Sequence, residues 1–203
     1  MNNGWTSIEE VRNEAITCCR CDLCYTRKHV VFGEGNSDAR IMIVGEGPGG
    51  DEDRQGRPFV GRSGKLLDSV LQRAGLGRND VWITNVVRCR PVLVEDTVCK
   101  NRPPRTSEVA ACDIWMSQEL RFVAPDAIVC LGAVSAQALT GRTLKLTQER
   151  GKWQIGRDAV EVMPTYHPAY ILRLSGEQRA VSEQLMIEDI RQAMMRMSRR
   201  NAA

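Results

Sequence analysis

The sequence lacks several features that would place it in a special class of protein. No uninterrupted apolar run among its 203 residues is long enough to span a bilayer, so we expect no membrane partner. The N-terminal residues show no basic segment followed by an apolar stretch, which predicts a cytoplasmic protein without a secretory leader. The P-loop pattern does not occur, and the glycines near residue 45 are by themselves only a weak signal, so a nucleotide cofactor is not indicated. Repeats and low-complexity linkers are missing too, and residues 1–203 are predicted to form a single domain.

The chain also lacks a large excess of charge of one sign. The net charge is only +3, with 42% hydrophobic and 26% charged residues, as in ordinary globular proteins. A charge this small permits a polyanionic partner but does not require one, because a local basic patch matters more than the total. We predict a monomer.

Cysteine, in contrast, is abundant. Eight cysteines in a cytoplasmic protein are unlikely to form a disulfide framework and indicate metal or cluster binding. Two of Cys18, Cys21 and Cys24 could join Cys89 and Cys112 in a four-thiolate site for zinc or for an iron–sulfur cluster. Both Cys18–Cys21 and Cys21–Cys24 have C-x-x-C spacing, so the spacing leaves the pair open. A thioredoxin-like redox pair is the alternative, and it is disfavoured because the motif follows a predicted helix rather than a strand.

The stretch 41–61 is the most informative part of the chain. Its first residues, 41–44, are apolar and β-branched, and glycines, a proline and acids follow at once. This pattern predicts a buried strand that ends in a loop, with a helix starting near Ser63. Ligands of open α/β sheets bind beside the carboxyl ends of such strands, and a helix start there suits an anion. By glycine content alone, an ordinary strand-to-helix turn explains the stretch equally well.

Strands and helices alternate along the rest of the chain. This order predicts an α/β protein with a mostly parallel sheet covered by helices on both faces. The predicted strands are 29–32 at an edge, 40–45, 80–87, 127–132, 151–155 and 159–163, and the predicted helices are 7–15, 63–74, 106–122, 133–139 and 179–197. Residues 92–105 are irregular and basic towards their end, so we predict an inserted basic loop that reaches DNA.

Four motifs in the same order resemble the family 4 uracil-DNA glycosylases, the iron–sulfur members of the uracil-DNA glycosylase superfamily. They are Gly-Glu-Gly-Pro-Gly at 45–49, Arg-Pro-Phe-Val-Gly at 57–61, Thr-Asn-Val-Val-Arg-Cys-Arg-Pro at 84–91 and His-Pro-Ala-Tyr-Ile-Leu-Arg at 167–173. The resemblance covers roughly residues 18–191. It implies a three-layer α/β/α fold with a central, mostly parallel four-stranded sheet. It also implies an enzyme that releases uracil from DNA and leaves an abasic site.

The resemblance also implies a ligand set for the cysteines. Cys18 and Cys21 match the family's first pair, so these two with Cys89 and Cys112 are expected to hold a 4Fe-4S cluster with a structural role. The interval from Cys89 to Cys112 holds 22 residues, which is longer than the family pattern. A sister group with a lengthened loop there carries a histidine that traps the product covalently. The loop 92–105 has no histidine, so this activity is not implied.

Six pocket residues follow from the same resemblance. Phe59 is expected to stack on the flipped base, and the amide of Asn85 suits the O4 and N3 edge of uracil. His167, as a neutral imidazole, is expected to donate to O2 of the leaving uracil. Gly45, Glu46 and Gly47 are expected to line the pocket. Because a small residue replaces the aspartate of another branch at Gly47, we expect a largely dissociative reaction, with Glu46 or Asn85 positioning the water.

The DNA contacts are expected on two segments. Arg57, Arg62, Arg173 and, with the least support, Lys65 are predicted to bind phosphates. The segment Tyr170, Ile171 and Leu172 is predicted to form an apolar wedge that fills the space left by the flipped base. The sequence leaves two other functions open. One is a protein that binds uracil or abasic DNA with little turnover, and the other is a zinc-bound structural protein without affinity for DNA.

Overall fold

The central element is a six-stranded mixed sheet. The computed structural model describes residues 4–95 and 98–200. Along the sheet the order is β1-β3-β2-β6-β8-β7. The strands are β1 (Glu34–Gly35), β2 (Ile41–Gly45), β3 (Trp82–Asn85), β6 (Ala127–Leu131), β7 (Gln154–Ile155) and β8 (Glu161–Thr165). The four central strands are parallel, as expected, and the two-residue strands β1 and β7 add antiparallel edges.

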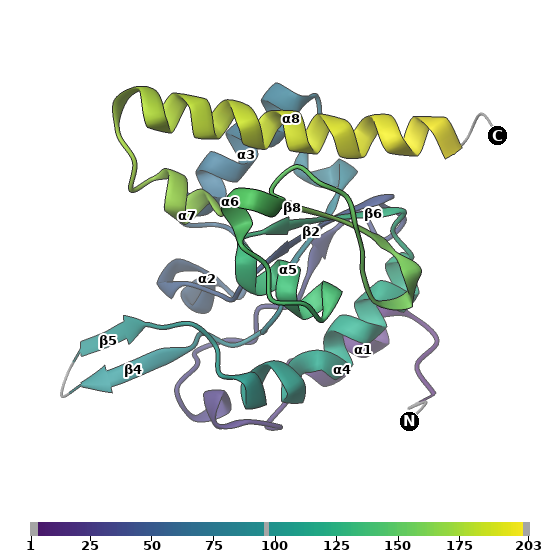
Figure 1. The fold of residues 1–203 in the computed structure, drawn as a ribbon. Coiled ribbons are helices and arrows are strands. Elements are labelled where there is room, and N and C mark those ends of the chain that lie inside the picture. The colour runs from purple at the N-terminus through teal and green to yellow at the C-terminus, as the bar shows by residue number, and fades with distance from the viewer. Residues whose placement is uncertain (1–3, 96–97, 201–203) are drawn as a thin grey trace.

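Helices cover both faces of this sheet and complete three layers (Figure 1). They are α1 (Ile8–Ala15), α2 (Gly50–Gln55), α3 (Arg62–Ala74), α4 (Thr106–Val123), α5 (Ala133–Thr140), α6 (Leu146–Glu149), α7 (Pro168–Ile171) and α8 (Gly176–Arg200). Short 3₁₀ turns lie at Asp22–Tyr25, Arg78–Asp80 and Arg157–Ala159. None of the helices that the structure describes is both long and apolar enough to cross a membrane.

The two faces of strand β2 explain the two cores. Side chains alternate along a strand, so Ile41 and Ile43 point to one face and Met42 and Val44 to the other. Ile41 and Ile43 belong to the core under α3 and α8, whereas Met42 and Val44 belong to the core under α1 and α4. All four side chains are completely buried. A continuous apolar run is therefore what a strand buried on both faces requires.

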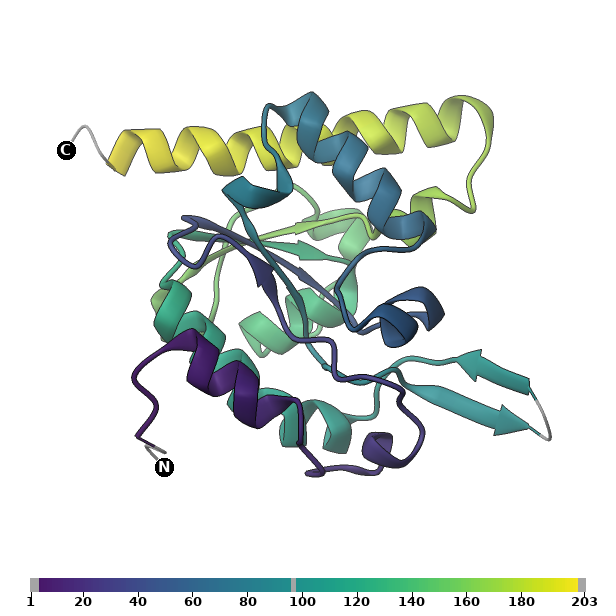
Figure 2. The same cartoon turned by 180° about the vertical axis from the view of Figure 1, so that it is seen from behind.

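Two expectations about local structure were wrong. Residues 29–32 form no strand, and the antiparallel edge strand β1 begins two residues later. The stretch 92–105 is not irregular throughout. It contains the antiparallel hairpin β4 (Val92–Glu95) and β5 (Val98–Asn101), which projects from the body of the protein in both views (Figures 1 and 2). The central part of the predicted loop, residues 96–97, lies outside the described residues.

The parallel strands bring distant parts of the chain to one edge of the sheet. Strand β2 ends at Gly45, opposite Asn85 at the end of β3, and β8 ends at Thr165, two residues before His167. The carboxyl ends of parallel strands are the usual position of a ligand site.

Candidate functional site

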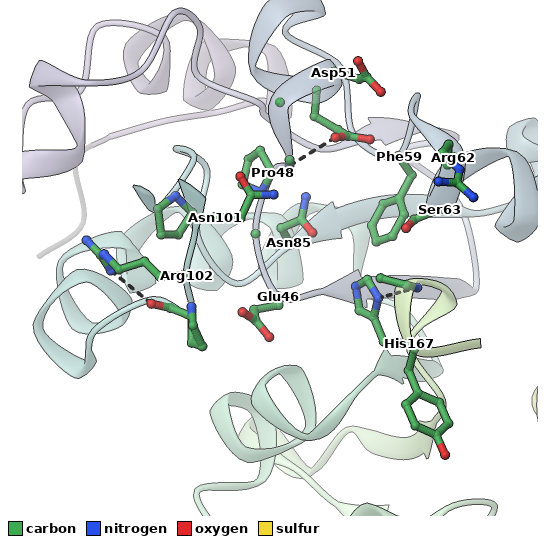
Figure 3. Close-up of a pocket in the computed structure, with 18 of the residues that line it drawn as sticks. Glu46, Pro48, Asp51, Phe59, Arg62, Ser63, Asn85, Asn101, Arg102 and His167 are labelled. Atoms are coloured by element: carbon green, nitrogen blue, oxygen red, sulfur yellow. Dashed lines mark hydrogen bonds between the residues drawn. The ribbon is translucent and has the colours of Figure 1, made fainter. Parts of the chain in front are cut away.

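A cavity of about 520 Å³ opens at this edge of the sheet. It is lined by all the predicted pocket residues except Gly45, namely Glu46, Gly47, Phe59, Asn85 and His167. Figure 3 shows Glu46, Phe59, Asn85 and His167 around it. Its rim includes Arg62, Tyr170 and Arg173, and the opposite wall comes from the base of the β4–β5 hairpin. The structure therefore joins residues that are more than 120 positions apart in the sequence.

Phe59 is held in an unusual backbone conformation. Its φ of 52° lies in the left-handed region, which non-glycine residues rarely adopt. Arg78 stabilises this turn, because its Nη1 donates to the carbonyl oxygen of Phe59 at 3.0 Å and its Nη2 to that of Pro58 at 2.7 Å. The ring then lies over Gly45, where an added Cβ would be 2.4 Å from the ring. Gly45 does not line the cavity, but only glycine leaves room there for Phe59.

Asn85 is almost completely buried at the end of β3, with 1% of its surface exposed. Its Oδ1 has no hydrogen-bond partner within the part of the chain that the structure describes. A buried acceptor without a donor costs free energy, on the order of 1–3 kcal/mol, so a ligand that supplies the donor is favoured.

A buried ion pair supports the backbone of Asn85. The guanidinium of Arg88 donates to the carbonyl oxygen of Asn85 at 2.5 Å, and it lies 2.8 Å from the carboxylate of Glu119. Both charged side chains are at most 1% exposed. Removing one member of such a pair costs about 3–5 kcal/mol, because the other charge is then left uncompensated. The pair thus holds the backbone of Asn85 in place at the end of β3.

His167 precedes helix α7, and its side chain is held by the backbone of that helix. Its Nδ1 accepts a hydrogen bond from the backbone N–H of Ala169 at 3.0 Å. A neutral imidazole that accepts at Nδ1 carries its proton on Nε2, and this N–H is then free to donate. Burial, with the nearby charge of Arg173, lowers the pKa of His167 to about 4. The ring is therefore neutral at physiological pH, and its centroid lies 6.1 Å from that of Phe59.

Glu46 and Gly47 form the floor beside Asn85. The Glu46 side chain is half-buried, and this burial raises the pKa of its carboxyl above the ordinary value. At Gly47, an added Cβ would lie 2.8 Å from the side chain of Val87. A larger residue at this position would therefore require Val87 to move. Along the chain, the nearest acidic group is the carboxylate of the neighbouring Glu46.

Glu52 is a site residue that sequence reasoning missed. Its carboxylate accepts three backbone N–H groups, from Gly49 at 3.1 Å, Val60 at 3.0 Å and Gly61 at 2.9 Å. It thereby joins the loop after β2 to the turn that carries Phe59. The only sequence signal was an acidic residue three positions after Gly49, which is a capping pattern for the short helix α2.

The predicted DNA contacts are only partly at the cavity. Arg62, Tyr170 and Arg173 line it, but Arg57 makes a two-pronged ion pair with Glu34 and does not. The predicted wedge is wrong for Ile171, because this side chain is completely buried in the core under α3 and α8. Tyr170 is 40% exposed, whereas Leu172 and Lys65 lie outside the cavity, Leu172 half-buried against that core and Lys65 exposed.

The cysteines form a second, small cavity. It is lined by the four predicted ligands, Cys18, Cys21, Cys89 and Cys112, and not by Cys24. Across the described ranges, no three side chains of His, Cys, Asp or Glu are arranged to hold a single metal ion.

Three N–H groups point at the sulfurs of this cavity. The Nε1 of Trp115 lies 3.3 Å from Cys18 Sγ, the backbone N of Arg88 3.3 Å from Cys112 Sγ, and Nη1 of Arg27 3.6 Å from Cys89 Sγ. Such donors stabilise cluster-bound thiolates. The donor set, four cysteine sulfurs from three separate segments, therefore fits a 4Fe-4S cluster, in which each cysteine binds a different iron.

Comparison with known proteins agrees with this geometry. Residues 32–191 match the family described as the uracil DNA glycosylase superfamily. The chain is 42% identical over 191 residues to a type-4 uracil-DNA glycosylase of Thermotoga maritima, with 92% of each chain covered. It is 45% identical over 163 residues to a type-4 uracil-DNA glycosylase of Pyrobaculum aerophilum, covering 77% of this chain and 80% of the relative. A type-5 uracil-DNA glycosylase of Pyrobaculum aerophilum is 30% identical over 201 residues, covering 82% and 83%.

Proposed function

The chain belongs to the type-4 uracil-DNA glycosylases of the uracil-DNA glycosylase superfamily, and we propose that its cavity holds the flipped uracil between Phe59, Asn85 and His167. It is a DNA-repair enzyme that hydrolyses the N-glycosidic bond of deoxyuridine and leaves an abasic site. The observation that carries the proposed roles is that one cavity holds both a neutral donor on His167 and an acceptor on Asn85 that has no hydrogen-bond partner in the described parts of the chain.

Base recognition follows from the amide of Asn85. Its Oδ1 accepts the N3–H of uracil, and its Nδ2 donates to O4, while the ring of Phe59 stacks on the base. Cytosine presents the opposite pattern, an acceptor at N3 and a donor at N4. A site built to hydrogen-bond one pattern rejects the other strongly, because its buried polar groups are left unpaired.

Cleavage follows from His167. When the bond between C1′ and N1 breaks, its electron pair stays on the uracil and spreads to O2. The Nε2–H of His167 donates to O2 and stabilises this developing negative charge, as an oxyanion hole does. A neutral donor suits this role, since the ring does not have to lose or gain a proton during the step.

The sugar is left as an oxocarbenium-like cation, which water captures. The water oxygen bonds to C1′ and releases a proton, which the Glu46 carboxylate can accept while it positions the water. Because Gly47 offers no carboxylate, bond cleavage precedes water attack in this proposal. The uracil anion then takes up a proton from solvent.

DNA outside the cavity is held by its phosphates. Arg62 and Arg173 lie at the rim on the side of α3 and α7, where they bind the phosphates flanking the flipped nucleotide. Tyr170, stacked on Tyr166 with ring centroids 5.4 Å apart, presents a flat apolar surface towards the space that the nucleotide leaves. Phosphate contacts of Arg57 and Lys65, and a wedge contact of Leu172, remain predictions.

Uracil release under multiple-turnover conditions tests the function. With a uracil-containing oligonucleotide in large excess over enzyme, we expect free uracil to exceed the enzyme concentration many times. A burst equal to one uracil per enzyme, followed by no further release, would support the alternative of a damage-binding protein with little turnover.

The cofactor proposed is a 4Fe-4S cluster on Cys18, Cys21, Cys89 and Cys112. A bound cluster would have a structural role and would take no part in the reaction. It would join the segment after α1, which carries Cys18 and Cys21, to Cys89 in the loop after β3 and to Cys112 in α4. The proposal extends to a single domain, a monomer and a cytoplasmic location, which stay expectations.

We predict that Cys18→Ser removes the cluster, whereas Cys24→Ser keeps it, although both cysteines belong to a C-x-x-C pair. The measurement is iron content together with visible absorption of protein purified without oxygen, with about four irons expected per wild-type chain. One zinc and no colour would instead favour the structural zinc site. Loss of iron in both variants would reject the assignment of Cys18 over Cys24.

A further inference from the structure

The β4–β5 hairpin is the one described part of the chain that projects from the body as a two-stranded ribbon (Figures 1 and 2). We call residues 92–95 and 98–101 the ribbon arm. Its register pairs Val92 with Asn101 and Val94 with Cys99. Val94 is 59% exposed and Leu93 45% exposed, and the Cys99 side chain is exposed as well.

The base of the ribbon arm is firmly attached. The guanidinium of Arg102 binds the carboxylate of Glu108 through two hydrogen bonds, at 2.8 and 2.5 Å, and donates to the carbonyl oxygen of Val92 at 3.1 Å. Arg90 Nε donates to Asn101 Oδ1 at 2.7 Å, which joins the arm to the segment after β3. These contacts fix the direction in which the arm leaves the protein.

The same base forms a wall of the uracil cavity. Pro91, Asn101, Arg102 and Pro103 line the cavity opposite the His167 side, as Figure 3 shows for Asn101 and Arg102. DNA that inserts a nucleotide between the two walls must continue past them. The ribbon arm leaves the protein from one of these two walls.

The side chains of the arm alternate between its faces. Asn101 lies towards the cavity, close to Gly49, so the paired Val94 and Cys99, two positions further along, share its face. Leu93 and Lys100 lie on the other face. The face on the cavity side thus carries the small, uncharged side chains of Val94 and Cys99, which allow close approach to a nucleic-acid surface.

The dimensions suit a duplex. Four residues of strand extend about 13 Å at roughly 3.3 Å per residue. This spans about four base pairs at 3.4 Å each. The major groove of B-DNA, about 12 Å wide, accepts a two-stranded β-ribbon. A single strand has no groove and offers nothing comparable.

We propose that the ribbon arm lies along double-stranded DNA beside the flipped nucleotide, so that the enzyme processes uracil in a duplex more efficiently than in a single strand. This inference rests on the proposed function of the cavity. The arm contributes to binding of the flanking duplex, while the chemistry stays with Asn85 and His167.

The test compares Val94→Glu with Leu93→Glu, which place the same charge on opposite faces of the arm. Each variant and the wild type are given one uracil-containing strand, with and without its complement. We expect wild type to show the higher kcat/KM on the duplex. Val94→Glu should lower that value about tenfold through repulsion from phosphates, with a change of less than about twofold on the single strand. Leu93→Glu should have the smaller effect.

Two results would overturn the proposal. One is an unchanged ratio of duplex to single-strand activity in Val94→Glu. The other is an equal loss on both substrates, since the arm would then support the cavity and not the duplex. If wild type released no uracil from either substrate, the proposed function would fail. The position of the arm on DNA would still be tested by disulfide coupling of Cys99 to a duplex.

Cys99 allows a direct test of proximity. A duplex carries uracil and, three or four base pairs away, a base with a disulfide-activated thiol tether. The Cys99 thiolate attacks this disulfide, forms a new S–S bond to the tether and expels the activating thiol. In the His167→Ala background we expect rapid coupling to the duplex and slower coupling to the single strand. Coupling that persists in Cys99→Ser, or that is equally fast on the single strand, would overturn the proposal.

Discussion

Replacing His167 with alanine is expected to slow uracil release by about 10²–10³-fold, the usual effect of removing one donor from an oxyanion hole. The variant keeps the stacking ring of Phe59 and the amide of Asn85, so kcat should fall more than KM rises. His167→Gln restores an N–H donor and should recover part of the rate. The measurement is single-turnover release of uracil from one oligonucleotide by all three proteins.

His29 offers a matched control, because it is the only other histidine and does not line the cavity. His29→Ala should release uracil at a rate close to wild type. If His167→Ala kept more than about a tenth of the wild-type rate, the proposed stabilisation of O2 would be wrong, since the expected loss is at least 10²-fold.

The contributions of His167 to activity and to stability should depend on pH in a defined direction. The pKa of His167 is lowered from an ordinary 6.5 to about 4, so the folded protein keeps the ring neutral where the unfolded chain already binds a proton. The contribution of His167 to activity should therefore persist down to about pH 5. Its contribution to stability is present above pH 6.5 and is lost as the pH falls towards 4. Urea unfolding at pH 7 and pH 5 should show a larger loss of stability in wild type than in His167→Gln.

Replacing Asn85 with aspartate is expected to lower uracil release by about 10³-fold or more, because an ionised carboxylate can accept hydrogen bonds but cannot donate to O4 of uracil. The same carboxylate can accept from N4 of cytosine. The preference for uracil over cytosine should therefore shrink or reverse. The measurement is release of each base from two oligonucleotides that differ only at that base.

Asn101→Asp is the matched control for this change. Asn101 lines the same cavity from the hairpin side, so the substitution adds the same charge at a different wall. Its ratio of uracil to cytosine release should stay that of wild type. Equal ratios for Asn85→Asp and wild type would show that the Asn85 amide does not read the base.

Local sequence patterns were sufficient for the framework of the fold. The apolar run 41–44 predicted a strand buried on both faces, and all four of its side chains are completely buried. The start of α1 was visible because Ser7 caps it, and capping depends on residues close in sequence. Helix α4 begins at Thr106, but its N-cap is Arg105, so Thr106 does not cap it as the sequence suggested. The strand end near Gly45 predicted a ligand site, since ligands of open α/β sheets bind beside the carboxyl ends of strands, and the structure places Asn85 opposite Gly45 at that edge.

The resemblance to a known family supplied most of the roles in the cavity, and local patterns could not have done so. A histidine before a proline is usually an ordinary turn residue. Only the contact between His167 Nδ1 and the N–H of Ala169 assigns its tautomer, and only its surroundings lower its pKa.

The roles of the residues that position the site could not be predicted from the sequence. Glu52, Arg78 and Arg88 act by binding backbone groups of other segments, so their roles depend on which segments the fold brings together. The hairpin β4–β5 was missed because a short two-stranded ribbon has no core to impose a clear alternation of polar and apolar residues.

The sequence by itself determined the alternation of strands and helices, the cysteines available for a cluster and the polar residues at the strand ends. These features depend on neighbouring residues or on residue chemistry alone. The tertiary structure decided which side chains face the cavity. It buried Ile171 in the core, paired Arg57 with Glu34, and left the acceptor of Asn85 without a hydrogen-bond partner among the described residues. Each of these outcomes depends on packing between segments far apart in the chain, which no local pattern encodes.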